Sequence, residues 1–329
     1  MKILICGAGG FIGGHLTKKL IEEGHDLYCA DIKPLEFWFQ TFDKSKNFSL
    51  DLKDFDNCKK VTTNIDYVFN MACNMGGMGF IENNKADCML SVLINTNLLR
   101  ACVSNKVKRY FFSSSACVYN AEKQKESFVP NLKEEDAYPA EPEDGYGWEK
   151  LFSERMCRHF TEDYGLETRV ARYHNVYGPF GTFDGGREKA PAAICRKIIN
   201  AKHKKLENID VWGDGEQTRS FLYIDDCVEG TLKLFHSNID KVLNIGSDEQ
   251  VSINQLIKIV EKISSYNVNK NYQLDKPKGV RGRSSDNTNI KKLLNWEPRL
   301  SLQEGMNFTY NWISEQIKSG SNIKKFSKS

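Results

Sequence analysis

The sequence lacks several features that would each indicate a particular class of protein. Its apolar runs all fall well short of the ~18 uninterrupted residues that a membrane span needs. Its 10 cysteines include no Cys-x-x-Cys pair, which argues against the usual zinc spacing, any other metal site and a small disulfide framework. The 46 basic residues nearly balance the 43 acidic ones, for a formal net charge of +3, so nucleic acid is not expected as the main partner.

The start of the chain and its thiols indicate where the protein works. Glycines appear from residue 7 onward, too early for the apolar core of a signal peptide. Most cysteines have apolar neighbours, and reduced thiols in a cytoplasm are the default for such a chain. We therefore expect a cytoplasmic protein with no membrane partner. A length of 329 residues with 40% hydrophobic residues is enough for one large domain or two.

Short apolar runs alternate with amphipathic stretches over the first half of the chain. The alternation predicts an α/β fold, a Rossmann-type doubly wound parallel sheet with helices on both faces. Residues 1–177, with a returning segment at about 219–246, are expected to form this domain, and 178–218 with 247–329 a smaller mixed α/β lobe. The strand-like runs are residues 2–6, 26–30, 65–72, 109–113, 168–173, 221–224 and 242–245, and the helix-like stretches are 90–104, 146–164, 192–201, 226–235, 253–263 and 302–317.

A glycine turn directly after the first strand predicts a dinucleotide site. Gly7, Gly10 and Gly13 let the backbone approach a pyrophosphate at the start of a helix. Asp31, 24 residues after Gly7, can accept hydrogen bonds from ribose hydroxyls and would repel a 2′-phosphate, which favours NAD over NADP. A glycine turn beside an ordinary surface aspartate is the alternative. The predicted cofactor-binding residues are Gly7, Gly10, Phe11, Ile12, Gly13, Asp31, Asp51, Ala72, Tyr146 and Lys150.

A tyrosine and a lysine four residues apart predict acid–base chemistry beside the cofactor. Tyr146 and Lys150 share one face of a helix. A nearby ammonium is expected to lower the pKa of the phenol from its ordinary ~10, making Tyr146 a usable base near neutral pH. Ser115, at the end of a predicted strand, could hydrogen-bond the same hydroxyl. An exposed helix pair without a function is the plain alternative.

Together these motifs resemble the extended short-chain dehydrogenase/reductase family, which modifies nucleotide-linked sugars. The resemblance runs essentially end to end. Four stretches look most like the branch of that family that epimerises GDP-mannose at C3 and C5. They are residues 74–80 (NMGGMGF), 114–119 (SSACVY), 185–193 (GGREKAPAA) and 279–283 (GVRGR).

The resemblance implies a redox-neutral reaction. Tightly held NAD would oxidise sugar C4 while Tyr146 removes the hydroxyl proton, and the resulting ketone would acidify C3 and C5. Cys117 and Lys189 match the acid and base that exchange protons there, before C4 is reduced again to give GDP-L-galactose or GDP-L-gulose. Both are chemically plausible, because a thiol and a buried lysine can trade protons near pH 7. Without a catalytic role, Cys117 would be a buried packing residue and Lys189 a solvated surface lysine.

The same resemblance implies a GDP-linked sugar substrate and a homodimer. The smaller lobe would bind the nucleotide sugar, with arginines suited to bidentate contacts with its diphosphate. The dimer would form through the helix that begins at Tyr146 and the one before Ser113. The implied substrate-binding residues are Gly76, Gly77, Ser115, Ala116, Cys117, Asn175, Glu188, Lys189, Ala190, Lys197, Gln217, Thr218, Arg219 and Arg283.

Other functions stay open at this stage. The segment after Tyr119 lacks the proline expected from the resemblance, and residues 201–210 look longer than usual, so the sugar could be a hexose or a heptose. Another NAD-dependent nucleotide-sugar epimerase or a 4,6-dehydratase is the nearest alternative. A non-catalytic NAD-binding regulator is a third possibility, although it would not need Tyr146, Lys150, Cys117 and Lys189 together.

Overall fold

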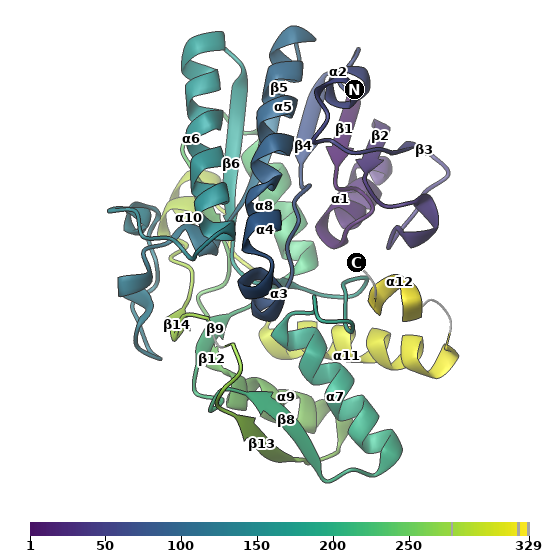
Figure 1. Ribbon diagram of the computed structural model, residues 1–329, viewed down its shortest axis with the longest axis vertical. Coiled ribbons are helices and arrows are strands. Elements are labelled where there is room, and N and C mark those ends of the chain that lie inside the picture. The colour runs from purple at the N-terminus through teal and green to yellow at the C-terminus, as the bar shows by residue number, and fades with distance from the viewer. Residues whose placement is uncertain (278, 321–322, 328–329) are drawn as a thin grey trace.

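A computed structural model describes residues 1–277, 279–320 and 323–327. Its main element is a seven-stranded parallel sheet in the order β11-β6-β5-β4-β1-β2-β3 (Figure 1). This arrangement confirms the predicted Rossmann-type fold. The strands are β1 (Lys2–Cys6), β2 (Asp26–Asp31), β3 (Ser45–Ser49), β4 (Tyr67–Asn70), β5 (Arg109–Ser115), β6 (Glu167–Tyr173) and β11 (Leu243–Ile245).

Helices cover both faces because successive strand side chains alternate between them. Ile3 and Ile5 of β1 belong to the core that contains α1 and α8, whereas Leu4 and Cys6 belong to the core under α2, α5 and α6. The chain returns after its excursion into the smaller lobe to add α8 and β11 to this unit. The helices are α1 (Phe11–Glu22), α2 (Phe55–Val61), α5 (Ser91–Ser104), α6 (Tyr146–Tyr164) and α8 (Ile224–His236).

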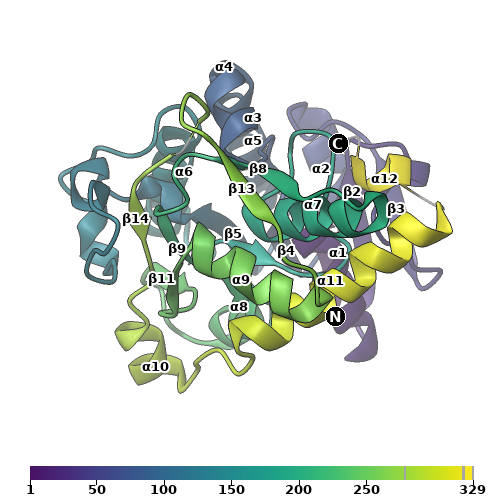
Figure 2. The ribbon, with the colours of Figure 1, turned by 90° about the horizontal axis from the view of Figure 1, so that it is seen from below.

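The smaller lobe lies beyond the carboxyl ends of the strands (Figure 2). Three helices, α7 (Ala190–Lys204), α9 (Ile253–Ser264) and α11 (Leu302–Ser319), pack on one another. A parallel pair of strands, β8 (Asn208–Trp212) and β13 (Asn269–Gln273), lies at the edge of the lobe. A small sheet joins β12 (Gln250–Ser252), β9 (Thr218–Ser220) and β14 (Gly282–Arg283), and it brings residues 219 and 283 side by side.

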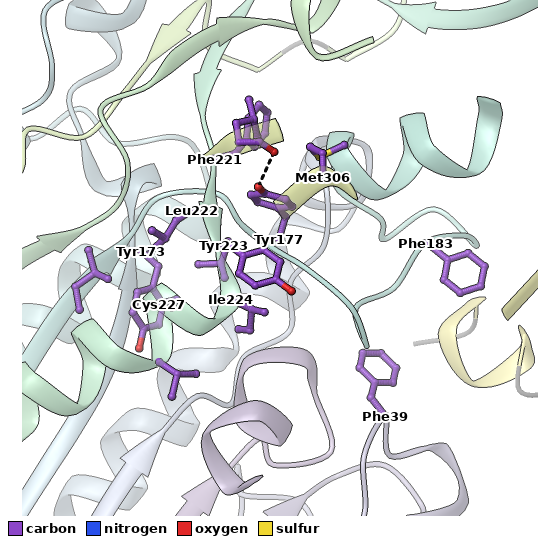
Figure 3. Packing of buried hydrophobic residues seen from close by; sticks show 14 of the residues in the cluster. Phe39, Tyr173, Tyr177, Phe183, Phe221, Leu222, Tyr223, Ile224, Cys227 and Met306 are labelled. Carbon is purple, nitrogen blue, oxygen red and sulfur yellow. Dashed lines mark hydrogen bonds between the residues drawn. The ribbon is translucent and has the colours of Figure 1, made fainter. Parts of the chain in front are cut away.

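An aromatic cluster joins the two parts of the molecule. Tyr177 of β7 (Val176–Tyr177) meets Tyr223 of β10 (Leu222–Tyr223) edge to face, and its hydroxyl donates to the carbonyl of Leu302 at 3.3 Å (Figure 3). Met306 of α11 packs in the same cluster. These contacts hold the helix of the smaller lobe against the strands that return to the main sheet.

The last described helix, α12 (Ile323–Ser327), packs over the loop after β2. Phe326 is 3% exposed and lies 5.2 Å, centroid to centroid, from the ring of Phe39. It also contacts Phe183 and Trp312, and its carbonyl accepts the amide of Phe183 at 3.2 Å. The C-terminal helix therefore connects the cofactor domain to the loop that leads to Lys189.

Two short helices precede α5. These are α3 (Met78–Asn83) and α4 (Lys85–Met89). By length and composition alone, Lys85–Ser104 could cross a membrane, with a mean hydropathy of 1.2. Of this apolar stretch 39% is buried inside the protein, and Leu98 and Leu99 are fully buried against the sheet.

Candidate active site

A cavity of about 500 Å³ opens where the main strands end. Residues directly after β1, β2, β3 and β4 line it, together with Ser115 at the end of β5. Ligands of open parallel sheets bind at this edge. The predicted site residues that line the cavity are Gly7, Gly10, Phe11, Ile12, Gly13, Asp31, Asp51, Ala72, Gly76, Ser115, Tyr146 and Lys189.

The glycine turn is tight because any side chain at its first or last glycine would collide with the backbone, and such a turn fits a dinucleotide. A Cβ on Gly13 would lie 2.2 Å from the carbonyl oxygen of Gly7, and one on Gly7 would lie 2.8 Å from the amide of Ala72. Gly7 also has a φ of +80°, which favours glycine. The first turn of α1 carries no acidic side chain and Gly10 supplies no capping side chain, so its N–H groups can receive an anion.

Asp31 lines this cavity at the end of β2. It is 7% exposed, and its Oδ1 accepts the backbone N–H of Lys33 at 3.0 Å. Burial raises the pKa of Asp31, while the Lys33 ammonium opposes the change. The Lys33 ammonium itself donates to the carbonyl of Gly9 at 2.8 Å and lies 3.9 Å from the ring centroid of Phe39. The lysine therefore orders the loop beside the carboxylate, a role that sequence reasoning missed.

Tyr146 opens α6 and points into the cavity beside Ser115. Gly145 precedes it with a φ of +62°, and the Ser115 side chain is its hydrogen-bond partner. Tyr146 is 4% exposed. Burial raises the pKa of its phenol, with further increases from Cys73, Cys117 and Glu149.

The prediction that Lys150 lowers the pKa of Tyr146 is therefore wrong for this structure. Lys150 is 1% exposed, and its Nζ lies 3.6 Å from Oε2 of Glu149 and 5.6 Å from the centroid of the Tyr146 ring. Nζ also lies 4.7 Å from the centroid of Phe112. The Glu149 carboxylate offsets much of the Lys150 charge, so the removal of the phenol from water has the larger effect on the pKa of Tyr146. Lys150 lies beneath the cavity lining.

Cys117 and Lys189 come from different parts of the chain and interact electrostatically, although of the two only Lys189 lines the cavity. Cys117 lies in the 3-10 helix η2 (Ala116–Val118), and its amide donates to Oγ of Ser115 at 3.2 Å. Lys189 precedes α7 and lines the cavity. Burial raises the pKa of Cys117 to about 11 and lowers that of Lys189, and the Cys117 side chain partly offsets the lowering at Lys189. These directions favour a thiol that holds its proton near neutral pH and a lysine that releases its proton more readily than a solvated one.

Two predicted phosphate ligands lie behind Cys117 on adjacent strands. Arg283 is 3% exposed and donates to Sγ of Cys117 at 3.6 Å and to Oε1 of Gln124 at 2.6 Å. Arg219 donates to the carbonyls of Thr218 at 2.7 Å and Val280 at 2.6 Å, and burial lowers its pKa to about 10. The two guanidiniums form a cationic group near the thiol.

Other residues implied for the substrate make contacts within the protein. Asn175 donates to the carbonyl of Ser220 at 2.9 Å, and Lys197 to that of Asp210 at 2.7 Å. Among the described residues, the cavity lining does not include Gly77, Ala116, Cys117, Lys150, Asn175, Glu188, Ala190, Lys197, Gln217, Thr218, Arg219 or Arg283.

The rest of this set also makes contacts within the protein. Gln217 donates to the carbonyl of Trp212 at 2.8 Å, and Thr218 donates to that of Ser127. A Cβ on Gly77 would lie 2.5 Å from the carbonyl of Glu188. Glu188 itself lies 3.1 Å from the guanidinium of Arg196, and Ala190 begins α7.

Sequence reasoning missed two charged residues of this region. Arg187 lines the cavity, donates to Oδ1 of Asn74 at 2.9 Å and to the carbonyl of Met75 at 3.0 Å. It joins two of the stretches that carry the resemblance, residues 74–80 and 185–193, so their pairing was the available signal. Glu143 lies beside Cys117 and Arg283, and its position in a loop before α6 offered no pattern to find it.

Comparison with known proteins assigns the family. The family model described as "NAD dependent epimerase/dehydratase family" matches residues 3–246. The chain belongs to this family. Membership confirms the predicted resemblance to extended short-chain dehydrogenases/reductases, the NAD cofactor and an enzyme of the epimerase type.

Two plant proteins are similar over almost the whole chain. GDP-mannose 3,5-epimerase 1 of Oryza sativa subsp. indica is 49% identical over 319 residues, which are 97% of this chain and 83% of that protein. GDP-mannose 3,5-epimerase of Arabidopsis thaliana is 47% identical over 321 residues, with the same coverage of 97% and 83%. Among solved structures, UDP-glucose 4-epimerase of Thermotoga maritima with UDP-glucose has a TM-score of 0.87 at 27% identity, covering 96% of this chain and all of that chain.

Proposed function

We propose that this protein epimerises GDP-mannose at C3 and C5. The observation that supports the proposal most is the pairing of Cys117 with Lys189 next to Tyr146, with opposite pKa shifts on the thiol and the ammonium. A 4-epimerase needs only the tyrosine end of this arrangement. The pair of Cys117 and Lys189 has a use only if a carbon next to C4 is inverted. The plant relatives named above carry the same activity in their names.

Three residues would carry out the proton transfers at the sugar. Bound NAD supplies the acceptor and later the donor of the hydride at C4. Tyr146, held by Ser115, would take the proton of the 4-hydroxyl and later return it. The 4-keto group acidifies the hydrogens at C3 and C5, so that Lys189 could remove one as a base while Cys117 donates from the other side of the enolate.

We also assign the diphosphate to the cationic residues around the smaller lobe. Arg219 and Arg283 are the arginines nearest the thiol, and their buried charges would favour a phosphate over water. Lys197 would add a third positive charge from α7. We propose a division of binding between a cofactor domain of residues 1–177 with about 219–246 and a nucleotide-sugar lobe of 178–218 with 247–329. The return of β11 to the main sheet supports this boundary.

The reaction can be tested by incubating the protein with GDP-mannose in D₂O and examining the sugar by NMR. We expect deuterium at C3 and C5, and new signals of GDP-L-galactose or GDP-L-gulose, without added NAD. A heat-inactivated sample controls for chemical exchange. Inversion at C4 with no deuterium at either carbon would indicate a 4-epimerase instead, and loss of water would indicate a 4,6-dehydratase. No reaction with GDP-mannose but exchange with a GDP-heptose would change the sugar while keeping the chemistry.

We propose that the protein is a homodimer of the cytoplasm. Four apolar side chains on α4, α5 and α6 are between 41% and 52% exposed: Met89, Leu93, Trp148 and Phe152. Met89 and Leu93 are four residues apart, as are Trp148 and Phe152, so the two members of each pair lie on the same helix face. The helices α5 and α6 also pack on each other. The 10 free cysteines are in keeping with a reducing compartment.

A charge in this patch should separate the subunits. Phe152→Glu is expected to convert the dimer to a monomer in light scattering after size exclusion, because a carboxylate would be buried without a partner. Phe308→Glu is the matched control, since Phe308 is 49% exposed on α11, away from the patch. An unchanged mass for Phe152→Glu would place the interface elsewhere.

A further inference from the structure

Glu143 is fixed against Cys117 by the backbone as well as by side chains. Its amide donates to the carbonyl of Cys117 at 2.9 Å, and its own carbonyl accepts the amide of Gly147 at 2.8 Å in the first turn of α6. A Cβ on Gly147 would lie 2.4 Å from the carbonyl of Cys117, so α6 packs closely against η2 at this point. These contacts hold the backbone of Glu143 beside Cys117.

The carboxylate of Glu143 lies between a cation and the thiol. The side chain is 10% exposed, and Oε2 lies 3.1 Å from Nη2 and 3.2 Å from Nη1 of Arg283. Oε1 is buried without a hydrogen-bond partner among the described residues. The Cys117 side chain interacts with the same carboxylate. A buried oxygen without a donor is costly, and the neighbouring S–H is a group that can donate to it.

Arg283 alone would have the opposite effect on the thiol. Its Nη1 lies 3.6 Å from Sγ, and a guanidinium at that distance favours a thiolate. A thiolate cannot donate a proton to a sugar enolate. The site therefore needs a negative charge that offsets the arginine without removing it from the diphosphate region.

We propose that Glu143 is a positioning residue that keeps Cys117 a protonated thiol beside Arg283, so that the thiol can serve as the acid of the epimerisation. The inference rests on the proposed role of Cys117 as the acid. It explains how the thiol keeps its proton next to Arg219 and Arg283. Glu143 itself need not touch the substrate.

The electrostatics of the cluster agree with this role. Burial and then the Glu143 carboxylate raise the pKa of Cys117 to about 11, while Arg283 and the Ser115 hydroxyl lower it. Burial alone would raise the pKa of Glu143, but Arg283, the Cys117 side chain and Arg219 bring it below its ordinary value, so Glu143 carries its charge near neutral pH. The titratable groups that face the thiol are Glu143, Tyr146, Lys189, Arg219 and Arg283.

The test measures the thiol directly, without substrate. Glu143→Gln keeps the shape of the side chain and removes its charge. We expect the apparent pKa of Cys117 to fall by about 1–3 pH units, because the charge of Arg283 is then unopposed at close range. Alkylation of Cys117 by iodoacetamide, followed across pH 6–10 by mass spectrometry of its peptide, should become about tenfold faster or more at pH 8.

Glu82→Gln is the matched control, because Glu82 interacts with Glu143 but is exposed; its alkylation profile should match the wild type. Glu143→Asp retains the charge at a longer distance from sulfur, so the pKa of the thiol should fall in this variant too, but by less than in Glu143→Gln. If Glu143→Gln does not fold, absorbance titration of thiolate near 240 nm in Glu143→Asp, with Cys117→Ala as blank, replaces it, and a downward shift smaller than one unit is expected from the longer distance to sulfur.

Unchanged alkylation in a folded Glu143→Gln variant, or an unshifted titration of Glu143→Asp where that replaces it, would overturn the inference. These results are separable from the proposed function. A shifted thiol profile in a protein that fails to exchange deuterium into GDP-mannose would support the role of Glu143 while removing the proposed reaction. An unshifted profile in a protein that does exchange deuterium would leave the reaction standing and remove Glu143.

Discussion

Replacing Cys117 by alanine is expected to stop deuterium exchange at C3 and C5 while leaving oxidation at C4 measurable. Loss of a positioned general acid lowers a rate typically ~10²–10⁴-fold, and we expect at least a hundredfold loss of exchange. Tyr146 and Ser115 are untouched, so the absorbance of reduced nicotinamide at 340 nm should still rise when GDP-mannose is added. Parallel NMR in D₂O and absorbance measurements on the same sample separate the two steps.

Cys227→Ala is the matched control for this variant. Cys227 is buried and its charge also affects Lys189, but it packs under Tyr173 in α8, without Ser115 or Arg283 beside it. Exchange should stay within a few-fold of the wild type, with some loss of stability from the missing sulfur. Undiminished exchange in Cys117→Ala would remove the thiol from the mechanism.

The cofactor half of the site could be predicted because it is built from local patterns. Gly7, Gly10 and Gly13 lie within one strand–turn–helix unit, and Asp31 ends the next strand, so their meeting follows from the period of the sequence and the parallel sheet. The helix predicted to begin at Tyr146 begins there. Each of these features is decided within about thirty residues of the chain.

The electrostatics could not be predicted in the same way. Lys150 was expected to act on Tyr146, but its effect depends on Glu149, which is buried beside it, and on how little water reaches the phenol. Arg283 and Cys117 are 166 residues apart in sequence. Their contact depends on β14 joining β9, two short strands without a clear apolar pattern.

Elements at the edges were harder to delimit for a related reason. The edge strand β3 has no fully buried residue, so alternation of apolar side chains is weak there. The segment 201–210, which looked longer than usual and rich in lysine, contains the end of α7 and the start of β8. Its lysines are mostly exposed, and its order comes from pairing with β13, far along the chain.

Tyr146→Phe is expected to remove hydride transfer and deuterium exchange together. Without the phenol, no group at that position can take the proton of the 4-hydroxyl, and without the ketone the hydrogens at C3 and C5 are not acidic. We expect losses of ~10²-fold or more in both measurements, in line with the removal of a general base. The phenyl ring keeps its packing with Cys117 and Ile81, so the fold should persist. This pattern differs from Cys117→Ala, which should retain the absorbance change.

Tyr173→Phe separates the chemistry of Tyr146 from the loss of any buried hydroxyl. Tyr173 also lines the cavity, and its hydroxyl lies 2.6 Å from Oγ1 of Thr231. Removing that hydrogen bond should cost about 1 kcal/mol of folding stability and leave both reactions within a few-fold of the wild type. Equal losses in the two variants would mean that cavity shape, not the proton of Tyr146, limits the reaction. A Tyr146→Phe protein that still exchanges deuterium at C3 and C5 would show that the ketone forms by another base, and Lys189, which also lines the cavity, would be the first residue to replace.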